Sequence, residues 1–333
     1  MYTIDFENHF YDKSIIQALA NRKQVPRYDS EKNVIYWNEN IQMPQGNLLE
    51  TLLDISDKRI QVMDENGIDK IVLSTSSGIE QIHTEESIEW CKQTNNTIAA
   101  LTKKYPGRFL GSMVLPEQYI DEALAEMQRC VNELGFVAWH THSNYGDTYP
   151  DESKYRPLFK KAEELGIYVY LHPALPSSNR FNDYGFAFAG PALGFTVDAM
   201  TTLLRLLLSG LFDDCPNLKM VVGHFGEALP FLLERIENRL NFIPNTTIKM
   251  KKSISTYFKQ NIWVTTSGNL SKSAYECTKE VLGVDKILFA SDYPFESLPE
   301  TMTFWKNMKL PEEELAKIFY KNAQALLTSC ESN

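Results

Sequence analysis

The chain contains two short apolar runs that end in histidine, Ile-Tyr-Val-Tyr-Leu-His (167–172) and Lys-Met-Val-Val-Gly-His (219–224). Two further runs end in residues of similar chemistry, Tyr-Thr-Ile-Asp-Phe-Glu-Asn-His (2–9) and Lys-Ile-Leu-Phe-Ala-Ser-Asp (286–292). Runs of this length and composition are typical of buried β-strands. In a parallel β/α barrel the carboxyl ends of all strands face one cavity, so residues far apart in sequence can share one ion. The four runs therefore predict a barrel with a metal site at its mouth.

Strand-like and helix-like stretches alternate along the whole chain, which is the pattern of a parallel sheet with crossover helices. We predict eight strands, at residues 2–8, 69–75, 109–114, 136–140, 167–172, 218–223, 261–266 and 286–291. Residues 1–333 are expected to form a single α/β domain, a (β/α)8 TIM barrel.

Two stretches interrupt the repeat, residues 10–50 after the first predicted strand and residues 173–195 after the fifth. Both leave the face that carries the candidate ligands, so we expect them to be lids or walls of a pocket. Helical segments near residues 296–308 and 312–327 end the chain and should pack on the outside of the barrel.

Charge and composition exclude several classes of partner. The net charge of −10 disfavours nucleic acid and anionic membranes, because both bind clusters of Lys and Arg. No signal peptide is visible, and the apolar segment 203–211 is too short to span a bilayer. The five cysteines are widely spaced and odd in number, which argues against a disulfide framework. We therefore expect a cytoplasmic protein.

The candidate metal ligands form a joint pattern. Alternate residues of a strand point the same way, so Glu7 and His9 should project together. A carboxylate and an imidazole suit Zn²⁺, Mn²⁺ or Fe²⁺. One such pair is weak evidence, but His172, His224 and Asp292 stand at three further strand ends. The coincidence predicts one metal site.

A second histidine pair, His140 and His142, stands at the end of the predicted fourth strand. We regard this pair as a rival metal site, and His140 as a candidate for lining the substrate pocket. The alternative is that both are exposed loop residues.

Longer motifs in the chain resemble those of the amidohydrolase-related, metal-dependent decarboxylases. The resemblance spans most of the chain. The motifs are most similar to those of γ-resorcylate and 2,3-dihydroxybenzoate decarboxylases, and the wider family includes aminocarboxymuconate semialdehyde decarboxylase. The Glu-x-His form of Glu7 and His9 points to the same branch. The other motifs are Leu171-His172-Pro173, Ser209-Gly210-Leu211-Phe212-Asp213, Gly223-His224-Phe225-Gly226-Glu227, Thr265-Thr266-Ser267-Gly268-Asn269 and Ser291-Asp292-Tyr293-Pro294-Phe295-Glu296.

The resemblance implies a mononuclear site for one divalent ion, Zn²⁺ or Mn²⁺. The implied ligands are Glu7, His9, His172 and Asp292. His224 and Glu227 match the family's pair of active-site residues beside the metal. A homodimer or homotetramer is also implied.

Decarboxylation of a hydroxybenzoate needs a proton on the ring carbon that bears the carboxylate. Asp292 is the candidate donor of that proton, and His224 would hydrogen-bond the substrate or a water molecule. Glu227 would fix the tautomer of His224; alternatively, it is only a first-turn helix residue. Three aromatic residues are candidate contacts of the substrate ring or ordinary core residues: Phe195, Tyr293 and Phe295.

The same cluster could instead activate water on the metal to hydrolyse a lactone, ester or amide. No lysine closes the predicted fourth strand, so a two-metal hydrolase with a bridging lysine is not expected. A barrel that binds metal or ligand without catalysis is disfavoured, because the ligand set is complete. We therefore predict a metal-dependent decarboxylase of a small aromatic acid, with a mononuclear hydrolase as the alternative.

Overall fold

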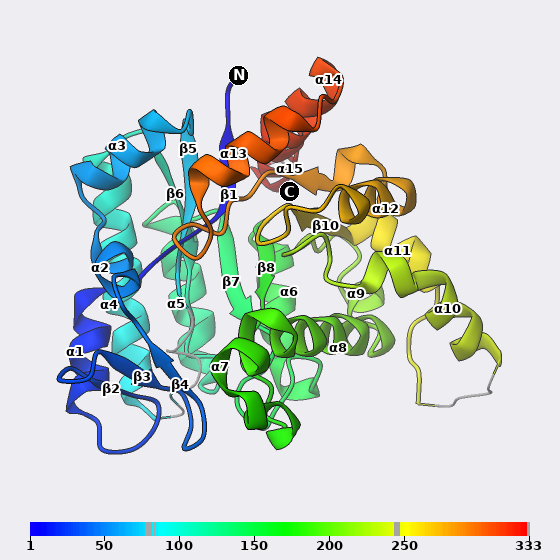
Figure 1. The fold of residues 1–333 in the computed structure, drawn as a ribbon. Coiled ribbons are helices and arrows are strands. Elements are labelled where there is room, and N and C mark those ends of the chain that lie inside the picture. Colours follow the sequence, from blue (N-terminus) through cyan, green and yellow to red (C-terminus); the bar gives the residue numbers. More distant parts are fainter. Residues whose placement is uncertain (77–81, 83, 243–246, 332–333) are drawn as a thin grey trace.

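The computed structural model describes residues 1–76, 82, 84–242 and 247–331. Its centre is an eight-stranded parallel sheet in the order β1-β5-β6-β7-β8-β9-β10-β11, surrounded by helices (Figure 1). Main-chain hydrogen bonds join β1 to the segment after β11 and close the ring. They include Phe6 N–H to Phe289 O at 3.0 Å and Asp292 N–H to Glu7 O at 3.1 Å. The predicted (β/α)8 barrel is confirmed.

The eight strands lie close to their predicted positions. They are β1 (Ile4–Phe10), β5 (Lys70–Thr75), β6 (Phe109–Met113), β7 (Ala138–His142), β8 (Tyr168–His172), β9 (Met220–Val222), β10 (Ile262–Thr265) and β11 (Ile287–Leu288). The last strand is much shorter than predicted. Beyond it, the N–H groups of Ala290 and Ser291 donate to the side chains of Thr266 and Asp5, at 3.0 and 2.9 Å, instead of continuing the ladder.

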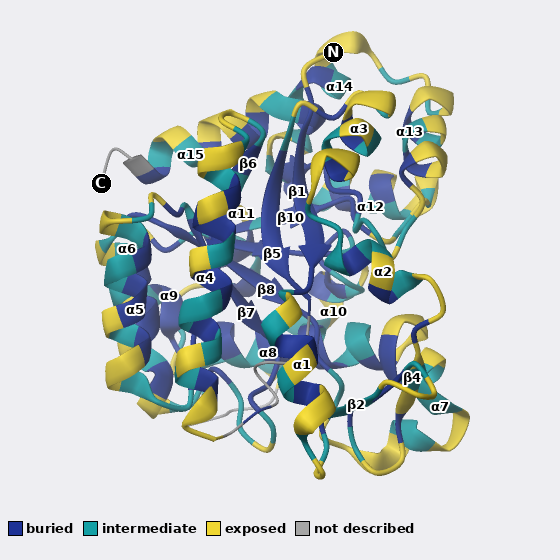
Figure 2. Cartoon of the chain, turned by 90° about the vertical axis from the view of Figure 1, so that its left-hand side faces the viewer, coloured by how far each residue is buried: buried dark blue, intermediate teal, exposed yellow. Residues whose placement is uncertain are grey.

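Helices connect the strands and surround the barrel. They are α1 (Lys13–Asn21), α2 (Leu48–Leu53), α3 (Asp57–Glu65), α4 (Glu86–Lys104), α5 (Ile120–Asn132), α6 (Arg156–Glu164), α7 (Gly185–Ala187), α8 (Gly194–Leu208), α9 (Leu211–Asp214), α10 (Leu229–Phe242), α11 (Ile254–Asn261), α12 (Lys272–Leu282), α13 (Leu298–Asn307), α14 (Glu312–Ala316) and α15 (Asn322–Glu331). Figure 2 shows the strands as the buried centre and the helices with exposed outer faces.

The first insertion contains structure that the sequence pattern did not predict. Strands β2 (Arg27–Asp29), β3 (Val34–Tyr36) and β4 (Gln42–Pro44) form a separate antiparallel sheet. Its apolar side chains, including Ile35 and Trp37, belong to a second hydrophobic core shared with α1 and α2. The insertion is therefore a packed unit at the carboxyl end of the barrel.

The second insertion leads from β8 through α7 into α8, and α7 packs against β4 of the first insertion (Figure 1). Among the described residues, no single helix is long and apolar enough to cross a bilayer. The helical stretches Asn179–Ala192 and Gly194–Leu208 meet the same length and composition test only as a pair bent by 62°.

The amino end of the barrel is covered by α15, which corrects our expectation for the last of the two terminal segments only. Leu326 of this helix packs in one core with Ile4 and Phe6 of β1. The Asn322 side chain donates to two carbonyl groups next to β11, each at 2.8 Å. Without α15 the apolar interior of the barrel would be exposed to water at this end, which explains the position of the helix.

Candidate active site

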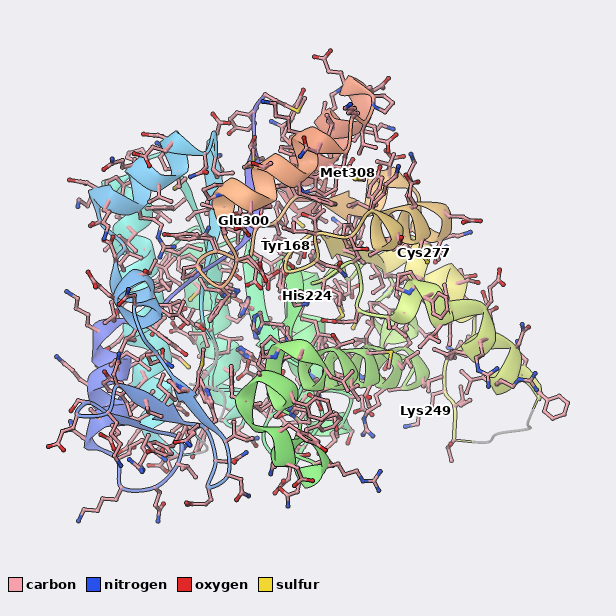
Figure 3. The ribbon with its side chains drawn as sticks, in the orientation of Figure 1. Tyr168, His224, Lys249, Cys277, Glu300 and Met308 are labelled. Atoms are coloured by element: carbon pink, nitrogen blue, oxygen red, sulfur yellow. The ribbon has the colours of Figure 1, made fainter. Side chains whose placement is uncertain are left out.

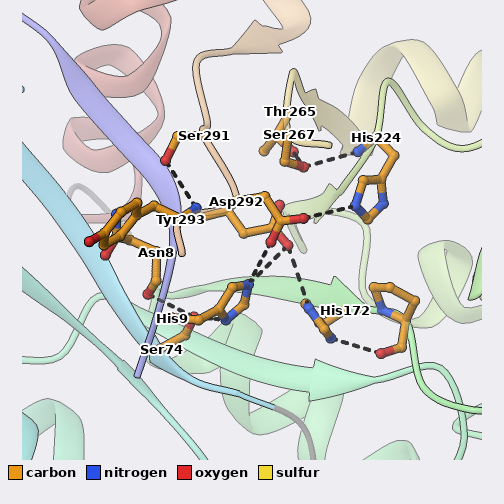
Figure 4. A network of polar contacts seen from close by, with 12 residues as sticks. Asn8, His9, Ser74, His172, His224, Thr265, Ser267, Ser291, Asp292 and Tyr293 are labelled. Atoms are coloured by element: carbon orange, nitrogen blue, oxygen red, sulfur yellow. Dashed lines mark hydrogen bonds and ion pairs between the residues drawn. The ribbon is translucent and has the colours of Figure 1, made fainter. Parts of the chain in front are cut away.

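The candidate metal ligands meet at the carboxyl end of the barrel. Glu7 and His9 lie in β1, His172 ends β8, and Asp292 follows β11. His9 Nε2 is 3.5 Å from Glu7 Oε1 and 3.3 Å from Asp292 Oδ1 (Figure 4). His172 Nε2 is 3.6 Å from Glu7 Oε1. The structure thus brings all four predicted ligands together.

The cluster fits a divalent cation. Glu7 Oε1 and His9 Nε2 are buried and have no hydrogen-bond partner among the described residues. One ligand atom each from Glu7, His9 and Asp292 lie within 4.8 Å of one another. Buried lone pairs that converge without partners are costly, and a shared positive ion would satisfy them. Two carboxylates and two imidazoles are ligands suited to Zn²⁺ or Mn²⁺.

Neighbouring groups orient these ligands. His172 Nδ1–H donates to the carbonyl of Pro173 at 2.8 Å, so its other ring nitrogen faces the cluster with a free lone pair. The hydroxyl of Tyr170 donates to Oε2 of Glu7, which leaves Oε1 for the ion. Tyr170 was not predicted as a site residue.

A buried carboxylate ties together the two segments that carry the acidic ligands. Asp5 accepts hydrogen bonds from the N–H groups of Glu7 at 3.2 Å and Ser291 at 2.9 Å. Ser291 precedes Asp292, so one side chain holds the backbone next to both acidic ligands. Burial raises the pKa of Asp5 to about 6, although the hydrogen bonds from Ser291 and Asn8 oppose this.

On the other side of β1, a buried guanidinium supports the backbone of His9. Arg59 donates to Asn8 Oδ1 at 2.6 Å and to His9 O at 3.1 Å. Its guanidinium also lies 4.8 Å from the centre of the Tyr293 ring. Tyr293 therefore packs beside this support and against the main core, which is the second of its two predicted roles, and it is not among the residues of the cavity wall.

His224 lies beside the ligands and contacts one of them. Its Nε2 is 3.8 Å from Asp292 Oδ2, and its Nδ1 is 2.8 Å from Glu227 Oε1. Glu227 is not a first-turn residue of a helix, because α10 begins at Leu229. Figure 3 places His224 near the centre of the molecule, whereas Lys249 and Cys277 lie toward its periphery.

The turn after β9 has an unusual backbone. The φ angles of His224, Phe225 and Glu227 are 53°, 57° and 58°, and Asp292 has a φ of 62°. Left-handed conformations of non-glycine residues cost on the order of 1–3 kcal/mol each and persist only where their surroundings enforce them. The strain is thus concentrated at the residues that surround Asp292.

Gly268 makes room for the contact between His224 and Asp292. Its φ is 57°, and a Cβ atom there would lie 2.7 Å from His224 Cδ2 and 3.3 Å from Asp292 Oδ2. A larger residue would displace the imidazole.

The ionisable groups of the cluster are strongly coupled. Burial alone lowers the pKa of His9, but the carboxylates of Asp292 and Glu7, at 3.3 and 3.5 Å from its Nε2, raise it to about 9. Burial alone raises the pKa of Asp292, but the neighbouring imidazoles of His224 and His9 bring it below its usual range. Burial, followed by the charge on His9, lowers the pKa of His172 to about 4. His172 is therefore neutral, as a metal ligand requires, whereas His9 has to lose a proton before it can bind an ion.

A cavity of about 570 Å³ opens next to the cluster. His172, His224, Glu227 and Asp292 line one end of it. Residues of both insertions line much of the rest, so the insertions are pocket walls, as predicted. The predicted aromatic contacts Phe195 and Phe295 are part of the wall.

His140 lies beneath the ligands and is not among the residues of the cavity wall. Its ring is 5.0 Å from that of His172 and stacks on Tyr170 at 5.4 Å. The residue is only 2% exposed, and His142 is fully buried, so the alternative of exposed loop histidines is wrong. His9, His140 and His172 form a second group whose ring nitrogens could share an ion.

A parallel barrel with candidate carboxylate and histidine ligands at its first, fifth and eighth strands has the architecture of a metal-dependent barrel enzyme. Within that class the chain belongs to the amidohydrolase family, whose sequence model matches residues 4–328. The family predicted from the motifs is confirmed.

Several of the most similar proteins are decarboxylases of aromatic acids. The chain is 35% identical over 307 residues to γ-resorcylate decarboxylase of Rhizobium sp., covering 87% of this chain and 90% of that protein. Dihydroxybenzoic acid decarboxylase of Polaromonas sp. JS666, solved with manganese and 2-nitroresorcinol, has a TM-score of 0.84, 32% identity and coverages of 98% and 97%. The structure of 5-carboxyvanillate decarboxylase of Novosphingobium aromaticivorans was solved with manganese and 4-hydroxy-3-methoxy-5-nitrobenzoic acid. It has a TM-score of 0.88 and 30% identity to this chain, and the match covers 98% of this chain and 96% of that one.

Proposed function

We propose that this protein is a metal-dependent, non-oxidative decarboxylase of a hydroxylated aromatic carboxylic acid. One observation carries the proposal. At the wall of an open cavity, one carboxylate oxygen of Asp292 lies near the other proposed ligands and its second oxygen lies near His224. The names of the relatives supply the reaction class and favour manganese, with zinc as the other candidate.

The proposed ligands of the ion are Glu7, His9, His172 and Asp292. A bound divalent ion would neutralise negative charge on the substrate and hold its carboxylate and neighbouring hydroxyl in position. Phe195 and Phe295, in the cavity wall, would contact the substrate ring.

We propose Asp292 as the group that delivers a proton to the ring carbon. A new C–H bond forms there, the bond to the carboxylate breaks, its electron pair returns to the ring, and CO₂ leaves. Asp292 ends the step as a carboxylate and takes its next proton from His224, whose Nε2 is 3.8 Å away. Glu227 holds Nδ1 of His224, so the other nitrogen stays directed at Asp292.

The variant Asp292→Asn tests this role. With Mn²⁺ in excess and its metal content confirmed by atomic emission, we expect the variant to bind a hydroxybenzoate, followed by tryptophan fluorescence, and to release no CO₂. Asp198→Asn is a matched control, because Asp198 is a buried aspartate that hydrogen-bonds Ser143 and Asn144 outside the cavity wall. Near-normal CO₂ release by Asp292→Asn would show that another group is the proton donor.

A parallel assay separates decarboxylation from hydrolysis. The manganese-loaded protein is incubated with a panel of hydroxybenzoates and a panel of lactones, esters and amides, and CO₂ and acid are followed together. We expect CO₂ from at least one hydroxybenzoate. Release of acid alone would replace the proposed function with the mononuclear hydrolase.

We also propose that residues 1–333 act as one barrel domain in the cytoplasm, as a homodimer or homotetramer, without nucleic-acid or membrane partners. The family model, which spans residues 4–328, supports one domain. The spacing of the cysteines and the net charge support the compartment and the partners. Light scattering coupled to gel filtration tests the oligomeric state.

A further inference from the structure

Three buried hydroxyl groups lie between the proposed ligand Glu7 and the turn after β9. They belong to Tyr170 in β8, to Thr265 at the end of β10 and to Ser267 in the loop that follows. All three residues are at most 2% exposed, so bulk water does not compete for their hydrogen bonds. Two of them belong to the motif at residues 265–269, which has no role in the proposed function.

These groups form one continuous series of hydrogen bonds, which we call the hydroxyl chain. At one end, the hydroxyl of Tyr170 bonds to Glu7 Oε2. Tyr170 Oη lies 3.2 Å from Thr265 Oγ1, which lies 2.8 Å from Ser267 Oγ. At the other end, the N–H of His224 donates to Ser267 Oγ at 3.2 Å (Figure 4). The hydroxyl chain thus crosses the barrel interior between strands β1, β8 and β10, which are not neighbours in the sheet.

The two ends of the hydroxyl chain fix the direction of every bond in it. An ionised carboxylate only accepts hydrogen bonds, and a main-chain N–H only donates. Each hydroxyl has one proton, so Tyr170 donates to Glu7 and Thr265 donates to Tyr170. Ser267 then donates to Thr265 and accepts from the His224 N–H. The main-chain N–H does not give up its proton, so the hydroxyl chain holds groups in position and does not conduct protons.

At the Glu7 end, the hydroxyl chain selects which carboxylate oxygen faces the other ligands. Tyr170 occupies Oε2. The second oxygen, Oε1, lies 3.5 Å from His9 Nε2 and 3.6 Å from His172 Nε2. The orientation of the carboxylate toward the proposed ion therefore depends on the bond from Tyr170.

At the other end, the hydroxyl chain holds the left-handed turn after β9. Ser267 Oγ binds the N–H of His224, and the carbonyl of Thr265 accepts from the N–H of Phe225 at 2.7 Å. The φ angles of His224 and Phe225 are 53° and 57°. Such angles persist only where the surroundings enforce them. These two bonds therefore help to fix the imidazole whose Nε2 lies 3.8 Å from Asp292 Oδ2.

We propose that the residues of the hydroxyl chain are positioning residues that couple the proposed ligand Glu7 to His224. One buried series of hydrogen bonds then sets both the metal ligand and the group that returns the proton. A change at one end reaches the other because successive hydrogen bonds polarise and orient one another. This inference rests on the proposed function for the roles of Glu7 and His224.

A double-mutant cycle tests the coupling. Tyr170→Phe breaks the hydroxyl chain at the Glu7 end, and Ser267→Ala breaks it at the His224 end. The dissociation constant of Mn²⁺ is measured by competition with a chelating dye, which does not depend on turnover. We expect Tyr170→Phe to weaken Mn²⁺ binding about tenfold and Ser267→Ala about threefold. The double variant should bind Mn²⁺ no more weakly than Tyr170→Phe alone, because the connection to Glu7 is already lost.

The middle hydroxyl offers a test by removal and rescue. Thr265→Val removes the hydroxyl and keeps the shape, so we expect about threefold weaker Mn²⁺ binding. At saturating Mn²⁺, kcat for CO₂ release should fall about tenfold with KM unchanged, because His224 is displaced while the groups that bind the ring are not. Thr265→Ser keeps the hydroxyl and should restore both the Mn²⁺ affinity and kcat.

Thr202→Val is the matched control. Thr202 is a fully buried threonine of α8 whose hydroxyl donates to the carbonyl of Ser143, and it is not among the residues of the cavity wall. The variant should leave the Mn²⁺ dissociation constant and kcat unchanged. Urea unfolding checks that each variant is folded. If Tyr170→Phe does not fold, the pair Thr265→Val and Thr265→Ser decides the inference.

Two results would overturn the inference: additive effects of Tyr170→Phe and Ser267→Ala on Mn²⁺ binding, or a Thr265→Ser variant as impaired as Thr265→Val. CO₂ release by the unmodified protein alongside either result leaves the proposed function intact. If no hydroxybenzoate releases CO₂, the proposed function fails, and the Mn²⁺ dissociation constants still decide whether the hydroxyl chain couples its two ends.

Discussion

The two ends of the barrel differ in composition and in backbone geometry. At the amino end, Leu326 of α15 packs on Ile4 and Phe6, and the chain forms an apolar cover. At the carboxyl end, Glu7 Oε1 and His9 Nε2 are buried without partners among the described residues, and the turn after β9 is left-handed. The comparison indicates that the amino end stabilises the fold, whereas the prearranged site at the carboxyl end lowers the stability of the folded protein.

The largest effect should come from Glu7→Gln at the carboxyl end. Loss of a hydrogen-bond partner of a ligand already costs 10–100-fold in metal affinity or activity, so loss of a ligand should cost more than about 100-fold. Bound metal is measured by atomic emission, and CO₂ release by gas analysis. The control is Glu126→Gln, a buried carboxylate paired with Arg129 outside the site, which should keep its metal. Full metal content in Glu7→Gln would remove Glu7 from the ligand set.

Leu326→Ala tests the opposite end. The lost side chain is 1% exposed, so we expect a loss of about 3 kcal/mol in the free energy of unfolding, measured with urea. Metal content and kcat should not change under native conditions. Gln324→Ala, on the exposed face of the same helix, should change the stability by less than about 0.5 kcal/mol. A change in kcat for Leu326→Ala would mean that the two ends are coupled.

Asp5→Asn tests the connection that holds the acidic ligands in place. An amide can replace only part of the hydrogen bonding of the carboxylate with the Glu7 and Ser291 backbone, so we expect about tenfold weaker binding of Mn²⁺, measured by competition with a chelating dye. Asp69→Asn is the control, because Asp69 accepts from the Thr3 N–H near the amino end of β1. Equal Mn²⁺ affinity of the unmodified protein, Asp5→Asn and Asp69→Asn would limit Asp5 to a structural role.

The smallest effect concerns Lys286, which precedes β11 at the amino end. Burial and nearby Lys219 lower its pKa from 10.5 to about 8, although its amino group lies 3.3 Å from the centre of the Trp263 ring. Between about pH 8 and pH 10.5 the folded protein therefore binds fewer protons than the unfolded chain, and this group makes stability rise with pH.

Lys286→Met should remove that rise, measured as the urea midpoint at several pH values, and should leave kcat unchanged. The exposed residue Lys306 provides the control variant Lys306→Met. An unaltered pH dependence in Lys286→Met would assign the rise to other groups.

The meeting of the candidate ligands with His224 could be predicted because it follows from one topological fact, whereas the choice of Glu7, His9, His172 and Asp292 as the ligands was implied by the family resemblance. Parallel strands of a barrel all end at the same mouth, so the residues at the ends of the apolar runs had to meet. The support behind the ligands could not be predicted in this way. Asp5 and Tyr170 are ordinary members of alternating strands, and Arg59 lies in a separate helix, so their contacts exist only after folding.

Two errors have local causes. The predicted fourth strand ended at residue 140, but β7 continues to His142, which moves His140 from the rim into the barrel interior. The strands β2, β3 and β4 have three residues each, too few to show a period of two in a polar segment.

The small sheet of the first insertion makes its main-chain ladder within itself: Tyr28 pairs with Ile35, and Ile35 pairs with Met43. Residues 27–45 therefore form a cassette that could be exchanged without altering any of the four proposed ligands. In protein engineering, replacing residues 27–45 by a different small antiparallel sheet would be a route to new substrates that keeps the proposed metal ligands.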